Sequence, residues 1–296
     1  MKQILELTKR NIRLFLRDRA TVFFSFLSSI ILVALYFLFI ASLFMQGFEQ
    51  SGSGLSTSDV NFVVYLQMMA GVLILNSLSL SLGAFITAAK DFESRRVDNF
   101  LLTPLSAGKL LASYLLGGFA VSFTLNALTW CGAALLIGIL TGHFITAATL
   151  FTGLGVLAVA SAISGAIMLL ITAVIRSSGA LGVISGIAGT FFGFLCGIYM
   201  PYSNLGEGTA KVGSLLPYTH LTIWFKQVVL GDAFERLNIT GKWIETLLDE
   251  VFSAKNLGLA GLDISLSVML ILCGVFGVGC LAVAFVVLRK RMRRAD

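Results

Sequence analysis

The sequence has little charge, and the charge that it has is unevenly placed. Only 12% of the 296 residues are Asp, Glu, Lys or Arg, whereas a soluble domain has about 25%. Residues 62–89 contain no charged side chain, and residues 110–175 contain only His143. Each stretch exceeds the roughly 20 apolar residues that cross a bilayer, and a soluble surface helix needs a polar face. These absences exclude a soluble fold and predict an all-α, multi-span membrane protein.

Other absences narrow the function. Ion-coupled transporters usually carry ionisable groups at membrane depth, but the apolar stretches contain no Asp, Glu, Lys or Arg and offer neutral polar residues such as Asn76, Asn126 and scattered Ser and Thr. The sequence contains no Gly-x-x-x-x-Gly-Lys-Ser/Thr loop, so the chain cannot cradle nucleotide phosphates by itself. We expect no catalytic residue, no metal site, no cofactor bound by this chain and no nucleic-acid partner. The four cysteines lie in apolar runs without paired spacing, which favours buried thiols over disulfides or metal ligands.

Six membrane spans are predicted, at residues 20–45, 62–88, 110–140, 145–175, 179–200 and 264–288. The third and fourth are separated by only Thr141, Gly142 and His143, which predicts a tight turn between antiparallel helices. Lys and Arg gather before the first span, in the second loop (89–109) and in the basic tail (289–296). The positive-inside rule therefore places both termini in the cytoplasm, and the long loop 201–263, with short helices, outside.

The N-terminal segment, residues 1–19, is amphipathic. At about 100° per residue its polar side chains fall within one third of the helical circle, and apolar side chains fill the rest. The polar members are Lys2, Glu6, Lys9, Arg10, Arg13 and Arg17. This pattern predicts an interfacial helix on the inner leaflet, with basic side chains at the lipid phosphates.

The second loop is the most specific segment. Val97, Phe100 and Leu101 form a small apolar face at helical spacing, and Pro104 should end the helix. A short helix with charges of both signs, held between two spans, suits docking onto a cytoplasmic partner.

The fifth span carries glycines at spacings of three and four, which places them on one helix face. They are Gly182, Gly186, Gly189, Gly193 and Gly197. Such a face lets two helix backbones approach closely. The neighbour can be a helix of the same chain or a second subunit.

These features together resemble the membrane subunit of type-2 ATP-binding cassette exporters. The resemblance rests on Phe-Leu-Arg-Asp-Arg-Ala-Thr-Val-Phe-Phe (15–24), on Leu-Leu-Thr-Pro-Leu-Ser (101–106), and on Leu-Leu-Pro-Tyr (215–218) in the long outer loop. It implies that the N-terminal helix is a connecting helix and that the second loop forms a coupling helix against an ATPase. The implied coupling residues are Asp91, Glu93, Arg95, Arg96, Asp98 and Phe100. Residues 202–230 would form short re-entrant helices, and a further helical pattern follows at 241–257.

The resemblance implies the permease subunit of an ATP-driven exporter in a bacterial or archaeal plasma membrane. A separate subunit would bind ATP and Mg, and a second copy or a related permease would complete the pathway. We expect the first, second and fifth spans to line that pathway and to suit a drug, a lipid-like molecule or a peptide. The lining candidates are Phe24, Phe26, Leu66, Met69, Asn76, Phe191, Phe194 and Tyr199. An ion-independent carrier and a membrane scaffold or sensor stay open as alternatives.

Overall fold

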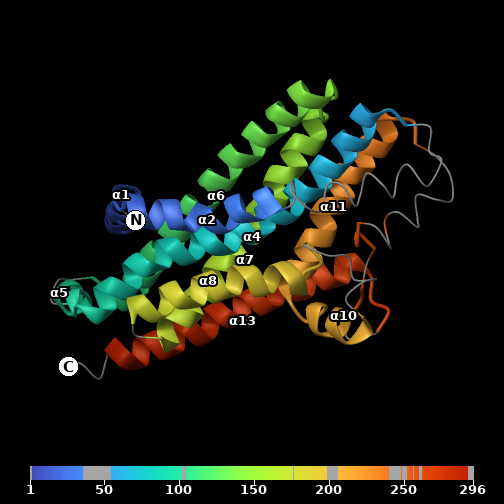
Figure 1. Ribbon diagram of the computed structural model, residues 1–296. Helices are drawn as coiled ribbons and strands as arrows, with labels where there is room; N and C mark the ends of the chain where they lie inside the picture. The colour runs from blue at the N-terminus through green and yellow to red at the C-terminus, as the bar shows by residue number, and fades with distance from the viewer. Residues whose placement is uncertain are drawn as a thin grey trace.

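The computed structural model describes residues 2–35, 55–101, 105–175, 177–198, 206–239, 248, 252–255, 257–259 and 262–292. These residues are nearly all helical (Figure 1). The helices are α1 (Lys2–Arg17), α2 (Arg19–Leu35), α4 (Thr57–Glu93), α5 (Arg96–Leu101), α6 (Ala107–Thr141), α7 (Ala147–Val174), α8 (Ser178–Leu195), α10 (Glu207–Gly213), α11 (Pro217–Arg236) and α13 (Leu266–Met292). The extended residues in these ranges pair only in the single bridge between Leu259 and Leu262.

Within the described part of the chain, four helices are long and apolar enough to cross a membrane: α4, α6, α7 and α13. They coincide with the second, third, fourth and sixth predicted spans. Helices α2 and α8 occupy the first and fifth, but α2 is described only as far as Leu35. The all-helical membrane architecture is therefore confirmed, whereas the count of six spans stays a prediction.

The helix ends follow from local side-chain chemistry. Helix α4 begins earlier than the apolar run because Ser56 and Asp59 form a capping box, and it continues to Glu93 at the other end. Helix α6 ends at Gly142, whose φ of 76° favours glycine, and Thr146 caps α7. The tight turn predicted between the third and fourth spans is confirmed.

Helix α4 is the centre of the chain. Among its most apolar 18 consecutive residues, 83% are buried, whereas the corresponding share is 28% for α6 and 22% for α13. Helices α2, α6, α7, α8 and α11 all pack on it, and Figure 1 shows it running through the middle of the bundle. The exposed faces of α6 and α13 carry large apolar side chains, as helices facing lipid do.

Neutral hydrogen bonds join the central helices at membrane depth. The Asn76 amide donates to Asn126 Oδ1 at 2.8 Å, and the Asn126 amide donates to Ser77 Oγ at 2.7 Å. Ser122 donates to the Ser77 carbonyl oxygen and is also paired with the Ser161 hydroxyl, each at 3.1 Å. Each such bond between membrane helices contributes roughly 0.6–2 kcal/mol. Helices α4, α6 and α7 are thereby fixed in one register.

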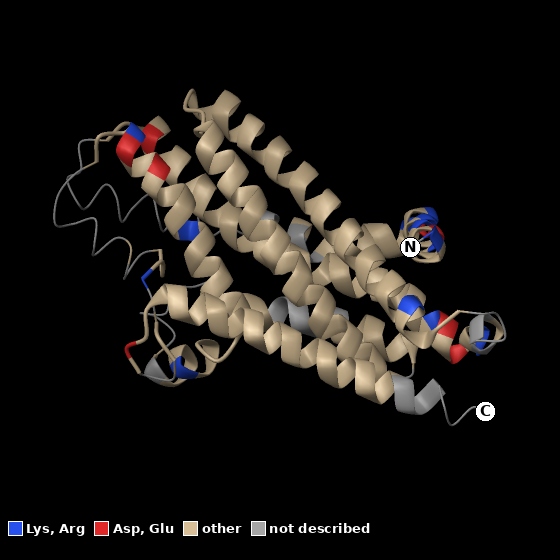
Figure 2. Cartoon of the chain, turned by 180° about the vertical axis from the view of Figure 1, so that it is seen from behind, with Lys and Arg blue, Asp and Glu red and all other residues tan. Residues whose placement is uncertain are grey.

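Charged side chains gather at the two ends of the bundle and leave the helices between them almost uncharged (Figure 2). Helix α1, helix α5 and the end of α13 lie at one end, and the start of α4 and the end of α11 lie at the other (Figure 1). The distribution of basic residues predicts that the first end is cytoplasmic, and we name the two ends cytoplasmic and outer on that prediction.

Helices α10 and α11 form the segment expected to be re-entrant. Helix α11 is longer than the short helices expected there and packs against α4, α7 and α13. The further helical pattern at 241–257 falls mostly outside the described residues, and residues 252–255 are not helical.

Sequence reasoning did not single out Lys226, which lies in the middle of α11 and is only 2% exposed. Its Nζ donates to the carbonyl oxygens of Gly197 at 3.1 Å and Phe252 at 2.7 Å. The next side chain, Gln227, donates to the Ala254 carbonyl at 2.7 Å. Burial lowers the pKa of the Lys226 ammonium to about 7, so the side chain is held there against a desolvation cost. Helix α11 thus ties the end of α8 to the outer segment 252–255.

We expect Lys226→Met to loosen this outer segment, because it keeps the side-chain stem and removes both hydrogen bonds. Losing such buried bonds costs roughly 1–3 kcal/mol. The readout is maleimide labelling of Cys196, which is 1% exposed, with the other cysteines replaced by Ala. Labelling should become about tenfold faster, whereas Lys211→Met on the exposed surface of α10 should leave it unchanged. Equal labelling rates in both variants would contradict the tie.

Candidate functional site

The candidate site is the polar network at the cytoplasmic end, where α1, the end of α4, helix α5 and the start of α6 meet. Helix α1 packs against α6, α4 and α2, and α5 packs against α4. Charges of both signs gather here in Figure 2. The network lies directly behind the loop that was expected to dock a partner.

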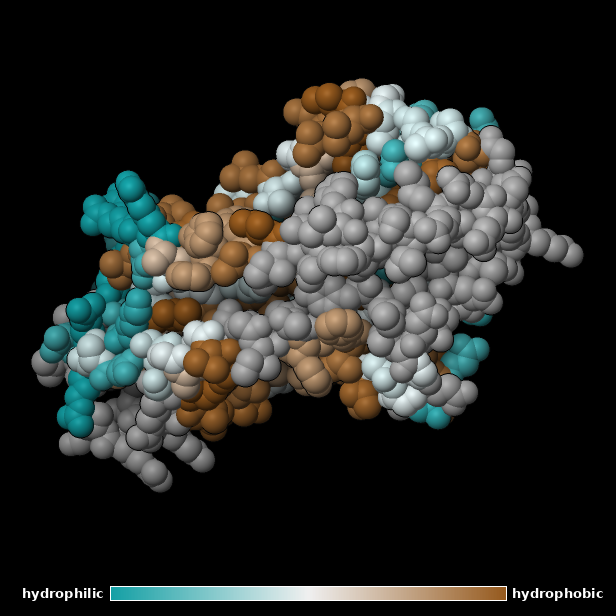
Figure 3. Space-filling view, viewed as in Figure 1, coloured by the Kyte–Doolittle hydropathy of each residue, from teal (hydrophilic) through white to brown (hydrophobic). Residues whose placement is uncertain are grey.

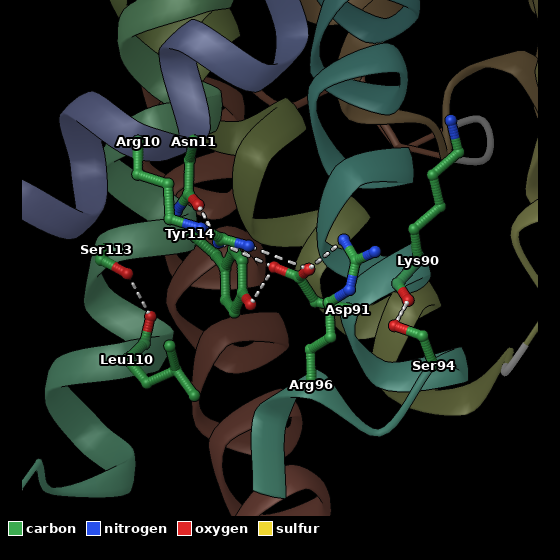
Figure 4. Close-up of polar contacts among 9 residues, drawn as sticks. All are labelled: Arg10, Asn11, Lys90, Asp91, Ser94, Arg96, Leu110, Ser113 and Tyr114. Atoms are coloured by element: carbon green, nitrogen blue, oxygen red, sulfur yellow. Dashed lines mark hydrogen bonds and ion pairs between the residues drawn. The ribbon is translucent and has the colours of Figure 1, made fainter. Parts of the chain in front are cut away.

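Asp91 is the centre of this network and is 1% exposed. The Arg10 guanidinium binds it with two parallel hydrogen bonds, from Nη1 to Oδ2 at 2.8 Å and from Nη2 to Oδ1 at 3.0 Å. The Tyr114 hydroxyl donates to Oδ2 at 2.8 Å, and Arg96 Nη1 lies 3.9 Å from Oδ1. Figure 4 shows Arg10 and Arg96 approaching the carboxylate from different sides. One carboxylate therefore connects α1, α4, α5 and α6.

The pairing is what allows a carboxylate to be buried here. An isolated buried charge costs several kcal/mol, and a bidentate Arg supplies both charge and hydrogen bonds in compensation. Burial by itself disfavours the charged Arg10 guanidinium, but its hydrogen bond and attraction to Asp91 outweigh that effect and raise the pKa of Arg10.

The turn between α4 and α5 places the loop on this network. Ser94 ends α4 by donating its hydroxyl to the Lys90 carbonyl oxygen at 2.6 Å. Arg95 adopts a positive φ of 54°, which reverses the chain. Helix α5 follows, and Val97 anchors it because this side chain is 3% exposed. A short helix in the second loop is therefore confirmed, at Arg96–Leu101, and of its predicted apolar face the description covers Val97.

The six predicted coupling residues have different environments. Asp91 is buried, whereas Glu93, Arg95 and Arg96 are exposed. Asp98 and Phe100 lie on α5, but their side chains are outside the description. A shallow hollow of about 310 Å³ is lined by Lys90, Glu93, Ser94 and Arg96.

Glu93 also links this loop to the fifth span. Its carboxylate accepts hydrogen bonds from the backbone N–H of Ser178 at 3.1 Å and from the Ser178 hydroxyl at 2.8 Å. Ser178 is the first residue of α8, and a carboxylate at a helix N-terminus is favourable. The α4–α5 turn is thereby connected to α8 as well.

Helix α1 is fastened to α6 along its length. Lys109 donates to Gln3 Oε1 at 3.1 Å, and Thr8 Oγ1 lies 3.5 Å from the Ser113 carbonyl oxygen. Asn11 fits against Gly117, where an added Cβ would lie 3.2 Å from the Asn11 Cβ. We therefore expect α1 and the first part of α6 to move together.

Residues 53–286 match the sequence profile of the family described as ABC-2 family transporter protein. The match covers most of the chain. This chain belongs to the ABC-2 transporter family. No curated protein gives a significant match to it. The protein is thus a multi-pass, non-catalytic membrane permease subunit of an ATP-binding cassette transporter, and the family implies a partner ATPase.

In this ABC-2 permease the expected pathway residues have different environments. Phe24 (64% exposed), Phe191 (61%) and Phe194 (46%) are on the surface of α2 and α8. Leu66 and Asn76 are buried inside the chain, at 0% and 1%. Phe26 is half-buried and Met69 buried, and Tyr199 lies outside the described residues.

The glycines of the fifth span also differ. A Cβ added to Gly182 would meet nothing within 4 Å, whereas Gly193 is buried. Gly197 lies beyond the end of α8 with a φ of 63°, so it serves the turn there rather than the helix face. Gly186 and Gly189 are on α8, but their surroundings are outside the description.

Sequence reasoning missed Arg10 and Tyr114 as partners of Asp91. Arg10 is one of several basic residues on the same face of α1, and Tyr114 sits within an apolar run. The only available signal was a carboxylate directly after a long apolar helix, which is a costly place for an unpaired charge.

We expect Asp91→Ala to destabilise the permease, because it leaves the half-buried Arg10 guanidinium without its counter-charge. Breaking one side of a buried ion pair costs about 3–5 kcal/mol. The thermal midpoint in detergent, followed by circular dichroism, should fall clearly. Glu6→Ala is the matched control, since its pair with Lys9 is exposed on both sides and contributes less than about 1 kcal/mol.

The double variant Arg10→Met/Asp91→Ala distinguishes the ion pair from the loss of side-chain packing. It should recover part of the lost stability, because no unpaired charge is left. Full additivity of the two single losses would mean that the pair does not stabilise this end.

Proposed function

We propose that this permease is one of two identical or related chains in an ATP-driven exporter of the bacterial or archaeal plasma membrane. A separate ATPase binds ATP and Mg and docks on the α4–α5 turn and α5. The coupling surface consists of Glu93, Arg95, Arg96, Asp98 and Phe100, and Asp91 supports it from behind.

The observation that carries this proposal is the division of the loop into exposed and buried side chains. Arg95, Arg96 and Asn99 face solvent, while Val97 and Asp91 are buried against the bundle. A force on the exposed side therefore reaches the network immediately beneath it. From Asp91 the displacement passes to α1 through Arg10 and to α6 through Tyr114.

A second route leads from the same loop to the pathway. Glu93 holds the start of α8, and α8 carries the exposed Phe191 and Phe194. Helices α2 and α8 both pack on α4 and contact each other. We place the substrate path between this surface and the second permease chain. Its apolar, aromatic character suits a hydrophobic or amphipathic substrate.

Among the coupling substitutions, Phe100→Ala and Asp98→Lys should weaken ATPase attachment and leave membrane insertion intact. Truncating an interface anchor commonly costs on the order of 2 kcal/mol, which corresponds to about 30-fold weaker binding. The measurements are copurification of the ATPase and the ATP hydrolysis rate of the complex. Lys211→Ala at the outer end is the control. If both variants keep full attachment and transport, the loop is not the docking site, and a scaffold or sensor role gains weight.

The second permease chain is tested at Gly182. Because a Cβ there meets nothing within the chain, Gly182→Leu should leave the single subunit folded. At a close subunit contact it should reduce the assembly from two copies to one, since overpacking costs roughly 1–3 kcal/mol. Gly182→Ala should be far milder. The measurement is the mass of the detergent-solubilised particle by light scattering. Identical masses for both variants would place Gly182 toward lipid.

A further inference from the structure

Helix α1 lies across the membrane helices rather than along them. In Figure 1 it is seen nearly end-on, while α4, α7 and α13 extend across the picture. It packs against α6, α4 and α2, and the side chains that remain exposed are Lys2, Gln3, Leu5, Glu6, Lys9, Arg13, Leu16 and Arg17. The remaining circumference of α1 is therefore free to meet something outside the chain.

The contacts of α1 show which of its sides is nearer the bilayer. Gln3 and Arg10 meet Lys109 and Asp91 at the cytoplasmic ends of α6 and α4. Asn11 instead meets Gly117, about two helical turns deeper along α6 than Lys109. Phe15 meets Gly83, which is deeper than Asp91 by the same amount along α4. The side of α1 that carries Asn11 and Phe15 is thus the membrane side.

An exposed apolar edge lies next to this membrane side of α1. Counted at about 100° per residue, Thr8 and then Ile12, Leu5 and Leu16 follow Phe15 around the helix. Leu5 is 56% exposed and Leu16 is 52% exposed. Figure 3 shows this end of the molecule, where hydrophilic and apolar surfaces lie directly beside each other. In an interfacial helix, exposed leucines at this depth would contact lipid hydrocarbon rather than water.

A basic edge comes next around the same helix. Lys9, Lys2 and Arg13 follow the leucines, then Glu6 and Arg17, and all five are exposed. Lys9 pairs with Glu6 at 3.3 Å. Among the described residues, Lys2, Arg13 and Arg17 have no acidic partner. The outward surface of α1 is therefore positive, with its apolar edge toward the membrane.

We propose that α1 docks on anionic phospholipid of the cytoplasmic leaflet and that this contact sets the position of the coupling loop. Leu5, Ile12 and Leu16 insert among the acyl chains, and Lys2, Lys9 and Arg13 bind the headgroup phosphates. An anionic surface matches both the charge and the order of the two edges. An ATPase docked on α5 would approach from the cytoplasm, opposite the apolar edge.

The transmission step rests on the proposed function of the α4–α5 loop. Arg10 projects from the same helix and binds Asp91 through two bonds. A lipid contact that fixes α1 therefore also fixes Asp91 and, through Arg96, the start of α5. Hydrolysis by the assembled complex should then depend on anionic lipid.

Docking is tested on the permease alone. A bimane probe is attached at Leu16→Cys or at Arg17→Cys in a Cys131→Ala background, because Cys131 is exposed and the other three cysteines are buried. The protein is placed in nanodiscs of phosphatidylcholine with or without phosphatidylglycerol, containing acyl-brominated lipid. We expect quenching at position 16 and little at position 17, with stronger quenching when phosphatidylglycerol is present. Equal quenching at both positions, or no effect of phosphatidylglycerol, would overturn the docking.

Regulation is tested on the complex with its ATPase in the same discs. Phosphatidylglycerol should stimulate hydrolysis in the parent protein, and Lys9→Gln/Arg13→Gln should lose that stimulation. The charge-matched control is Lys211→Gln/Lys255→Gln at the outer end, which should retain it. Lipid-dependent quenching without lipid-dependent hydrolysis would overturn the regulatory step alone. A complex that neither assembles nor hydrolyses ATP in any lipid would instead count against the proposed function.

Discussion

The buried ion pair between Arg10 and Asp91 holds the cytoplasmic end of this permease together. A carboxylate that is 1% exposed must satisfy its charge inside the protein, and each of its partners comes from a different helix. Removing Arg10 would leave a buried carboxylate without its main counter-charge. The end of α4, where the loop begins, is thereby held to α1 and α6. The helices are connected here because the buried Asp91 carboxylate needs partners from each of them.

The kind of polar interaction changes along the bundle in the way that the bilayer demands. Ionised groups pair at the cytoplasmic end, while amides and hydroxyls such as Asn76, Asn126 and Ser122 join the helices at membrane depth. Neutral groups cost less to bury where water is absent. Further along the bundle, Lys226 in the middle of α11 is held by backbone carbonyls rather than by a carboxylate. The ion pairs at the end of α4 thus give way to neutral hydrogen bonds in its well-packed middle.

The sequence is sufficient for the features that depend on composition and period. Uncharged runs predict the four helices that can span a membrane, and Gly142 predicts the turn between α6 and α7. The helical spacing of apolar residues from Val97 predicts α5. The family is also recognisable from these features. Period alone cannot choose among side chains that share a face, however. Arg10 lies on the same face of α1 as other basic residues, but it alone among them binds Asp91, which is 81 positions away in the sequence.

The sequence also does not reveal which polar residues of the apolar helices are buried against a partner. Asn76 has the character of a pathway residue in sequence, but its amide is used to join α4 to α6. Lys226 lies in a loop too long and too mixed in charge for a topology argument, and only the fold shows what it holds. In each case the missing information is a tertiary partner, which local pattern does not contain.

The bidentate geometry of Arg10 gives α1 a role that a simple charge would not. A lysine in its place would fix a distance to Asp91 and leave the helix free to rotate about that contact. Two parallel bonds from a planar guanidinium also fix orientation. The orientation of α1 about its own axis also sets where Leu5 and Leu16 point, so the two bonds couple that orientation to the position of the end of α4, from which the coupling loop begins.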